Sequence, residues 1–427
     1  MKRLTARLAL VLLIFPATAS AVEVGTYGTT IVRFEERSAP GFAKERLVPA
    51  TQFLGIDTYR LGDDNLSLHL YGWGRVDLAD RSTAEKDTDA DLSYGYLDYR
   101  FPKANGAIRA GRFFLYEGVA AEQLDGVNAR ADLAKGFTAS VFGGAPVKLD
   151  RDGRSKGDYI VGGRMSYRLA GILEIGASGL HEGRVLLDPV SGVTDDRQLV
   201  GGDVWLSPHR AIEVRGRTVY SASTQAIAEH SYLLTVKPVP AFSVTGEYNE
   251  NRLKDYFAFT NLRSLFNPDA GDTVWYYGAS ATYAVAKAAE VMADYRHYRR
   301  DTLGGSDRFG GELRLTFLDN KVRGGASYHR LEGASGINSF HELRGYVLYD
   351  DKKYAASIDA IEHLYKDNIY GRKSAYEIAG SIGYHVMTNL ALSGDLSYGQ
   401  NPQQNDELKG LVRLTFNYST ASKGAGK

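Results

Sequence analysis

The sequence predicts an all-β protein, a transmembrane antiparallel β-barrel of about 22 strands, within roughly 20 to 24, with no plug domain. Three observations carry this prediction. Apolar and polar residues alternate in segments of about ten residues from residue 22 to residue 418. Short and long connections follow one another between these segments. The chain also holds 47 glycines and 28 tyrosines, which suits barrel walls and aromatic girdles.

The alternation is clearest between Leu66 and Leu78. Leucine and valine occupy one face of this segment, and serine, histidine, tyrosine, tryptophan, arginine and aspartate occupy the other. Side chains of a β-strand point alternately to its two faces. One face of the segment therefore suits lipid, and the other suits water.

Turn residues or polar residues separate the segments. The short breaks fall at 62–65, 102–106, 134–136, 170–171, 207–210, 237–240, 286–288, 318–320, 350–353 and 387–389. Longer loops are expected at 37–48, 79–90, 146–157, 183–197, 251–272, 333–339, 366–373 and 400–407. An even number of strands places both termini on the short-turn side. A soluble β-solenoid or sandwich would also alternate, but such regular connections are rare in those folds.

The N-terminus has the pattern of a secretory signal peptide. Lys2, Arg3 and Arg7 precede an apolar segment at 8–15, and small residues at 19–21 form a cleavage site. The apolar segment is too short to span a bilayer. We therefore expect a signal peptide at 1–21, a barrel at 22–418 and a disordered tail at 419–427.

Composition narrows the class of partner. The chain carries 51 basic and 51 acidic residues, and the predicted signal peptide holds three of the basic ones, leaving 48 against 51. Such balance argues against a nucleic-acid partner. The sequence has no cysteine, which excludes a disulfide, a cysteine nucleophile and a covalently attached c-type haem on this chain.

Charged residues mark the expected lumen face, because a charge on the lipid face at the bilayer midplane costs roughly 2–4 kcal/mol. Applied strand by strand, this test gives a polar lumen of both signs, which can set ion selectivity. An alternative is that each of these side chains only solvates the inner wall. The predicted pore-lining residues are Arg75, Asp77, Asn128, Arg130, Asp132, Arg164, Arg168, Glu213, Arg215, Arg217, Glu290, Asp294, Arg296, Arg308, Glu312, Arg314 and Arg413.

A barrel of this size without a plug would leak, so we expect an element that narrows it. The longest loop, 251–272, is the internal candidate. It could fold into the lumen as an apolar-faced turn, dock a partner, or pack on neighbouring outer loops. The residues expected to narrow the lumen or contact a partner are Phe257, Phe259, Leu262, Leu265 and Phe266. A separate protein held in the lumen is the other candidate.

The last predicted strand, 411–418, alternates and ends on Phe416 and Tyr418. It resembles the closing strand of Gram-negative outer-membrane β-barrel proteins of the porin-like kind. The resemblance covers residues 22–418, although here a nine-residue tail follows the aromatic end. It implies an outer-membrane location, contact with lipid and passive diffusion of small hydrophilic solutes or ions. The chain is also similar to the barrel subunit of porin–cytochrome complexes, which implies a multihaem c-type cytochrome in the lumen and electron transfer.

Catalysis is not expected. The nine histidines, such as His69, His181 and His363, are scattered over separate segments, and none lies in a local nucleophile motif. We therefore predict no catalytic residue, no metal site and no cofactor of this chain's own. Two hypotheses remain open: a passive channel that conducts alone, and a sheath that depends on its cytochrome.

Overall fold

The computed structural model describes residues 23–38, 45–62, 64–79, 88–147, 157–188, 193–252, 273–301 and 304–420. Almost all of them lie in strands. The first strands are β1 (Glu23–Ser38), β2 (Glu45–Leu47), β3 (Pro49–Tyr59), β4 (Leu66–Asp77), β5 (Thr88–Phe101), β6 (Gly106–Glu117), β7 (Ala120–Asp132), β8 (Phe137–Pro146), β9 (Tyr159–Leu169), β10 (Leu173–Asp188), β11 (Val193–His209) and β12 (Ile212–Ser221).

The second half of the chain continues the same pattern. Its strands are β13 (Ala226–Val239), β14 (Phe242–Arg252), β15 (Thr273–Ala286), β16 (Ala289–Arg300), β17 (Gly304–Phe317), β18 (Val322–Gly333), β19 (Phe340–Asp350), β20 (Tyr354–Ile369), β21 (Arg372–Met387), β22 (Leu390–Asn401) and β23 (Gln404–Ser419). Two 3-10 turns, η2 (Ala134–Gly136) and η3 (Gly336–Asn338), lie in connections.

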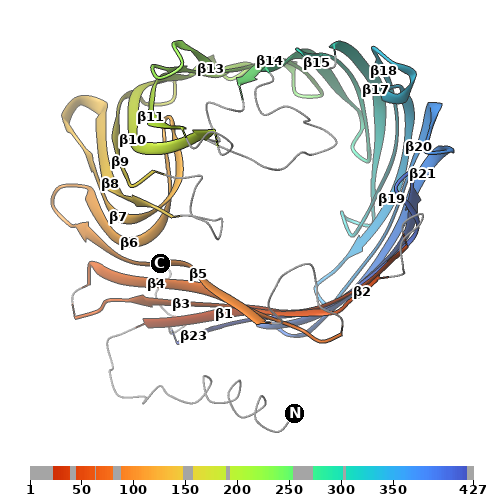
Figure 1. Cartoon of the computed structure of the whole chain (residues 1–427), viewed down its shortest axis with the longest axis horizontal. Coiled ribbons are helices and arrows are strands. Elements are labelled where there is room, and N and C mark those ends of the chain that lie inside the picture. The colour runs from red at the N-terminus through yellow and green to blue at the C-terminus, as the bar shows by residue number, and fades with distance from the viewer. Residues whose placement is uncertain are drawn as a thin grey trace, which may run out of the picture.

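The strands form one closed barrel. Each long strand pairs antiparallel with its neighbours in sequence, and β1 closes the ring by pairing with both β3 and β23. The three-residue β2 only extends one end of β1. The ring therefore contains 22 strands, which confirms the predicted fold class. Figure 1 shows β1 and β3–β5 on one side of the ring and β13–β15 opposite them.

Both termini of the described chain lie at the short-turn end, as the even strand number requires. Gly25 of β1 pairs with Ser419 of β23, and the amide of Thr420 donates to the carbonyl of Val24 at 2.9 Å. The last strand therefore runs past the predicted boundary at residue 418. The predicted signal peptide and most of the predicted tail lie outside the described residues.

Several predicted loops are part of strands. The stretch 183–197, expected as a loop, contributes to β10 and β11, which pair as far as Asp188 and Val193. The connection of β20 to β21 is only Tyr370 and Gly371, whereas the sequence predicts a loop at 366–373. Polarity explains both errors, because a strand that continues beyond the membrane into water no longer needs an apolar face.

The outer face of the barrel is apolar. Exposed aliphatic side chains come from strands around the ring, among them Leu97, Val127, Val141, Val161, Val200, Leu234, Leu313, Val347, Ile358, Ile382, Leu396 and Val412. Aromatic side chains on this face gather near both ends of the strands. Near the short turns lie the pairs Tyr99–Phe101, Phe137–Tyr167, Phe242–Tyr283 and Tyr354–Tyr384, and near the other end lie Trp275–Tyr277, Tyr328–His341 and Tyr376–Tyr398. This is the outer surface of a membrane-spanning barrel.

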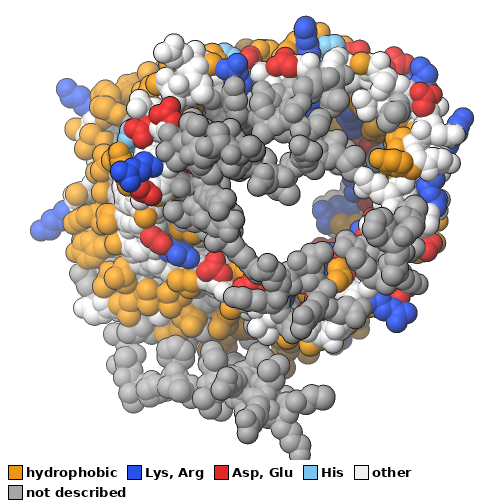
Figure 2. All heavy atoms as spheres, in the orientation of Figure 1, with side chains coloured by type: hydrophobic (Ala, Val, Ile, Leu, Met, Phe, Trp, Pro, Cys, Tyr) orange, Lys and Arg blue, Asp and Glu red, His pale blue; other side chains and the backbone are white. Residues whose placement is uncertain are grey.

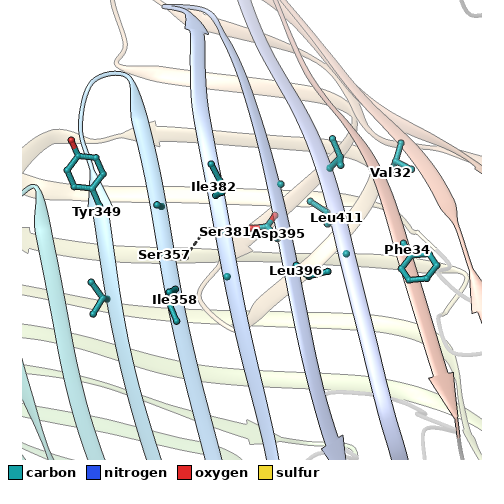
Figure 3. Close-up of a pocket in the computed structure, with 16 residues that line it drawn as sticks. Val32, Phe34, Tyr349, Ser357, Ile358, Ser381, Ile382, Asp395, Leu396 and Leu411 are labelled. Atoms are coloured by element: carbon teal, nitrogen blue, oxygen red, sulfur yellow. Dashed lines mark hydrogen bonds between the residues drawn. The ribbon is translucent and has the colours of Figure 1, made fainter.

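A shallow apolar groove of about 850 Å³ lies on this outer face across β1 and β19–β23. Figure 3 shows Ile358, Ile382 and Leu396 along it. Glycines such as Gly394 and Gly410 deepen the groove because they have no side chain. It belongs to the lipid-facing surface. Within the described residues, no helix has the length and hydropathy to cross a membrane.

Candidate functional site: the barrel lumen

The hairpin formed by β6 and β7 leaves the barrel wall. Pairing between β5 and β6 ends at Gly95 and Arg112, although both strands continue beyond this point. Pairing between β7 and β8 ends at Leu124 and Pro146. Within residues 113–123, strand pairing therefore joins only β6 to β7, across the two-residue connection 118–119, and the amide of Val147 donates to the carbonyl of Gln123 at 2.8 Å. We call this segment the inserted hairpin.

The tip of the inserted hairpin lies against the inner wall. The amide of Val119 donates to Ser178 Oγ on β10 at 3.0 Å. A side chain at Gly201 on β11 would meet the Val119 side chain. Next to the turn, Ser140 Oγ on β8 donates to Glu117 at 3.1 Å. Each strand of the inserted hairpin extends about 20 Å from the wall at 3.3 Å per residue. This length matches four strand spacings of about 4.8 Å, the distance along the wall from β7 to β11.

An apolar cluster holds the hairpin in place. Each large side chain buried in it contributes roughly 1.5–3 kcal/mol. The cluster joins one face of the hairpin to inward-facing residues of β8–β13: Phe113, Leu115, Val119, Ala120, Leu124, Phe142, Ile160, Leu180, Leu199, Val219 and Ala228. The opposite face of the hairpin remains exposed, with Phe114 at 43% and Tyr116 at 77%.

The turn requires glycine at residue 118. Gly118 has a φ of 58°, in the left-handed region that glycine adopts without steric cost. A Cβ there would also lie 2.2 Å from Ser178 Oγ. Any other residue would push the tip off the wall.

A buried ion triad connects the β7 strand of the hairpin to the barrel wall. Arg197 on β11 bridges Glu122 of the hairpin and Glu182 of β10, the latter at 2.6 Å. The amide of Gly157 donates to Glu182 Oε1 at 2.8 Å. All three charged side chains are less than a tenth exposed. A buried charge needs such pairing, because desolvation alone would disfavour it strongly.

The wall formed by β16–β20 carries a second charged network. Asp294 accepts from Arg308 at 2.8 Å and contacts His329 Nε2 at 2.9 Å. Glu342 lies 3.5 Å from His329 Nδ1 and 3.1 Å from His363 Nε2. Acids, bases and histidines thus alternate along this side of the lumen. No group of three or more potential ligands in the described residues has the arrangement of a metal site.

The predicted pore-lining residues all lie on the face opposite the exposed apolar side chains, by the register of the strands. They occupy β4 (Arg75, Asp77), β7 (Asn128, Arg130, Asp132), β9 (Arg164, Arg168), β12 (Glu213, Arg215, Arg217), β16 (Glu290, Asp294, Arg296), β17 (Arg308, Glu312, Arg314) and β23 (Arg413). The structure brings together Asp294 with Arg308, Arg314 with both Glu290 and Glu312, and Glu213 with Arg215.

Other predicted residues pair with acids that were not singled out from the sequence. Arg164 bonds to Asp203 at 2.5 Å and to Glu174 at 3.2 Å, and Arg217 bonds to Glu229 at 2.7 Å. These acids occupy the inward phase of their own strands. The same alternation test therefore holds the signal that would have found them.

The inserted hairpin is the main feature that the sequence analysis missed. The predicted constriction, Phe257, Phe259, Leu262, Leu265 and Phe266, lies outside the described residues. Instead, the described element that occupies the lumen is 113–123, a segment assigned to neither the short nor the long connections. Its signal was the run Phe113–Tyr116, which is apolar on both faces where a simple wall strand would be apolar on one.

The hairpin fills one sector of the lumen. Figure 2 shows charged side chains around the mouth of the barrel and hydrophobic side chains gathered on the outer wall at the left, over the region of β6–β10. The structure combines a closed 22-strand ring, an apolar exterior and a charged interior. The chain has the fold of an outer-membrane β-barrel.

Comparison with known proteins agrees on the fold. No protein-family model and no curated protein matches the sequence. A G324V mutant of PfeA, the ferric enterobactin receptor of Pseudomonas aeruginosa, is similar over 92% of this chain and 80% of its own, with 10% identity and a TM-score of 0.55. OccAB4 of Acinetobacter baumannii matches 95% of this chain and 100% of its own, with 10% identity and a TM-score of 0.45. OccK8 (OprE) of Pseudomonas aeruginosa matches 93% and 98%, with 10% identity and a TM-score of 0.45.

Proposed function

We propose that this barrel is a porin-like channel of the Gram-negative outer membrane, exported by the signal peptide at 1–21, through which small hydrophilic solutes or ions diffuse passively. The observation that carries the proposal is the lumen itself. Its wall is charged with both signs, and among the described residues only the inserted hairpin projects far into it. A hydrated, fixed-charge wall suits water-soluble solutes and sets ion selectivity. The proposal contains no catalytic step.

The direct test is electrical. The mature chain, refolded in detergent and inserted into a planar lipid bilayer, should produce discrete single-channel current steps in potassium chloride. Reversal potentials in a salt gradient then give the cation-to-anion preference. A heat-denatured sample of the same preparation is the control for detergent leaks. Folded barrels that insert but carry no current would contradict the proposal.

A cytochrome sheath is the competing hypothesis from the sequence. The inserted hairpin weighs against it, because it takes up the lumen beside β8–β12 and reduces the space for a second protein. The discriminating measurement is the visible absorption spectrum of the barrel purified from its native membrane in mild detergent. A stoichiometric haem band would replace the channel proposal with the sheath, whereas a colourless, conducting barrel would retain it.

A further inference from the structure

A platform of aromatic rings lies on the lumen wall formed by β1 and β3–β5. Tyr27 of β1, Gly55 of β3, Tyr71 of β4 and Tyr94 of β5 are in register at one level of the barrel. Phe53 lies one step toward the end with the longer loops. All of these positions share the inward face with Arg75. We call Tyr27, Phe53, Tyr71 and Tyr94 the aromatic platform.

The rings of the platform lie nearly parallel to one another. The ring of Tyr71 makes angles of 19°, 16° and 17° with those of Tyr27, Phe53 and Tyr94, at centroid distances of 6.0, 6.3 and 5.4 Å. Gly55 makes this arrangement possible, because a Cβ there would lie 2.3 Å from the Tyr27 ring. The Tyr27 ring therefore lies over the backbone of β3. The four rings stack on one another along the wall, and each is only half-buried, so part of every ring remains open to the lumen.

The aromatic surface continues along the barrel axis. Trp73, Tyr71 and His69 occupy successive inward positions of β4 and span about 13 Å at the rise of a strand. His69 stacks on Tyr96 at 5.0 Å, and Arg109 lies 4.6 Å above the Tyr96 ring. The platform together with Trp73, His69 and Tyr96 forms an elongated aromatic surface, which we call the track. It ends at the base of the inserted hairpin, where Tyr96 contacts Phe113.

Polar groups border the track at its edges. The hydroxyl groups of Tyr27 and Tyr94 lie 2.7 Å apart, and His69 Nδ1 contacts Asp57 at 2.7 Å. The lumen face of β3–β5 carries Asp57, Asp77, Asp89, Asp91 and Asp98, against Arg75 and Arg100. Arg109 and Arg112 of the neighbouring β6 lie 3.4 Å from Asp98 and 3.6 Å from Asp91. The charges on this wall are therefore largely balanced, which suits a neutral solute.

We infer that the aromatic platform is a binding track for the pyranose rings of a neutral oligosaccharide, an inference that rests on the proposed channel function. A sugar ring presents flat C–H faces that pack on aromatic faces, and hydroxyl groups around its rim that exchange hydrogen bonds with both donors and acceptors. The platform supplies a continuous aromatic surface, and its borders supply carboxylates, tyrosine hydroxyls, His69 and Arg109. The length of the track suits a chain of rings better than a single ring.

The test measures block of single-channel current by maltohexaose in a planar bilayer. Wild-type channels should show a saturable block, whereas a polyethylene glycol of the same hydrodynamic radius should not. Tyr71→Ala should weaken the block roughly tenfold, equivalent to ~1.4 kcal/mol of binding. Tyr71→Phe keeps the ring and should retain the block. Tyr276→Ala, on the inward face of β15 across the lumen, is the matched control and should also retain it.

The outcomes separate the inference from the channel proposal. A conducting barrel whose block by maltohexaose equals that by the polymer, or is equally weakened by Tyr71→Ala and Tyr276→Ala, overturns the platform and leaves the channel. Should the barrel not conduct, the fluorescence of Trp73 in a Trp205→Phe, Trp275→Phe variant titrated with maltohexaose in detergent decides separately. A saturable change abolished by Tyr71→Ala supports the platform, and an unchanged signal overturns it.

Discussion

Arginine has two roles in this lumen, and burial distinguishes them. Arg197 is 6% exposed between Glu122 and Glu182, whereas Arg215 is 64% exposed beside Glu213. Removing one member of a buried pair leaves an uncompensated charge, which costs roughly 3–5 kcal/mol. An exposed pair contributes about 0–1 kcal/mol, because water screens it.

We therefore predict that Arg197→Met strongly destabilises the barrel, while Arg215→Met has little effect. The measurement is the urea midpoint of unfolding in lipid vesicles, followed by tryptophan fluorescence. The two residues lie on neighbouring strands and receive the same substitution, so general effects of the change cancel. Equal shifts for both variants would show that the triad does not hold the hairpin.

A turn residue outside the membrane gives a prediction about pH. Asp351, between β19 and β20, accepts from the amides of Lys353 at 2.7 Å and Tyr354 at 2.8 Å and from the Tyr349 hydroxyl. These hydrogen bonds, that of Tyr349 first, lower the pKa of Asp351 from 3.8 to about 2. Its contribution to stability is therefore complete above the ordinary pKa and disappears as the pH falls toward 2.

Asp351→Asn should accordingly lower the thermal midpoint of the barrel at pH 6, and the difference from wild type should vanish near pH 2. The measurement is a pair of melting curves by circular dichroism at each pH. Asp319, in the turn between β17 and β18, provides the control substitution. A difference that persists unchanged at pH 2 would rule out the titration of Asp351 as its cause.

At the scale of the element, the sequence predicts a strand well and its path poorly. A wall strand has lipid on one side and water on the other, so alternation reveals both its existence and its inward residues, as for Glu290 and Asp294. The inserted hairpin breaks this rule, because one face of residues 113–116 packs on an apolar cluster inside the barrel and the other is apolar although it is exposed. Where it packs depends on Ser178, Gly201 and Val219, which come from strands far along the chain and leave no local signal.

The two faces of the inserted hairpin predict opposite results for the same substitution. Val119→Asp would place a carboxylate in the apolar cluster, at a cost of several kcal/mol, and should release the tip into the lumen. Tyr116→Asp changes the exposed face and should leave the hairpin in place.

Hydrogen exchange of residues 113–123, measured by mass spectrometry in detergent, should rise sharply in Val119→Asp only. The single-channel current of this variant should become noisier and change in mean amplitude. Identical exchange in the two variants would contradict the packing described for the tip. Tyr116→Asp serves as the matched control, since the residues lie three positions apart in one hairpin.

At the scale of the whole molecule, closure separates three environments around one sheet: lipid, the lumen wall and the buried cluster under the hairpin. The pairing of β1 with β23 fixes this separation, because a shift of one residue would turn Arg413 toward lipid and Val412 toward the lumen. The strand number and the inside–outside assignment could be predicted from the sequence because both follow from alternation. The occupancy of the lumen could not, because it depends on how the closed ring packs against itself.

The three tryptophans test this separation across the whole barrel. Trp275 lies on the outer face, stacked on Tyr277 at 6.0 Å near the loop end, whereas Trp73 and Trp205 lie on the inward face. Because fluorescence quenching requires contact, brominated lipid should quench the variant that keeps only Trp275, and iodide in water should quench those that keep only Trp73 or Trp205. Each single-tryptophan variant is measured in vesicles of brominated and ordinary lipid, with phenylalanine at the other two positions. Quenching of Trp73 or Trp205 by brominated lipid would require the opposite strand register. That result would contradict the charged lumen, the proposed channel and the aromatic platform together.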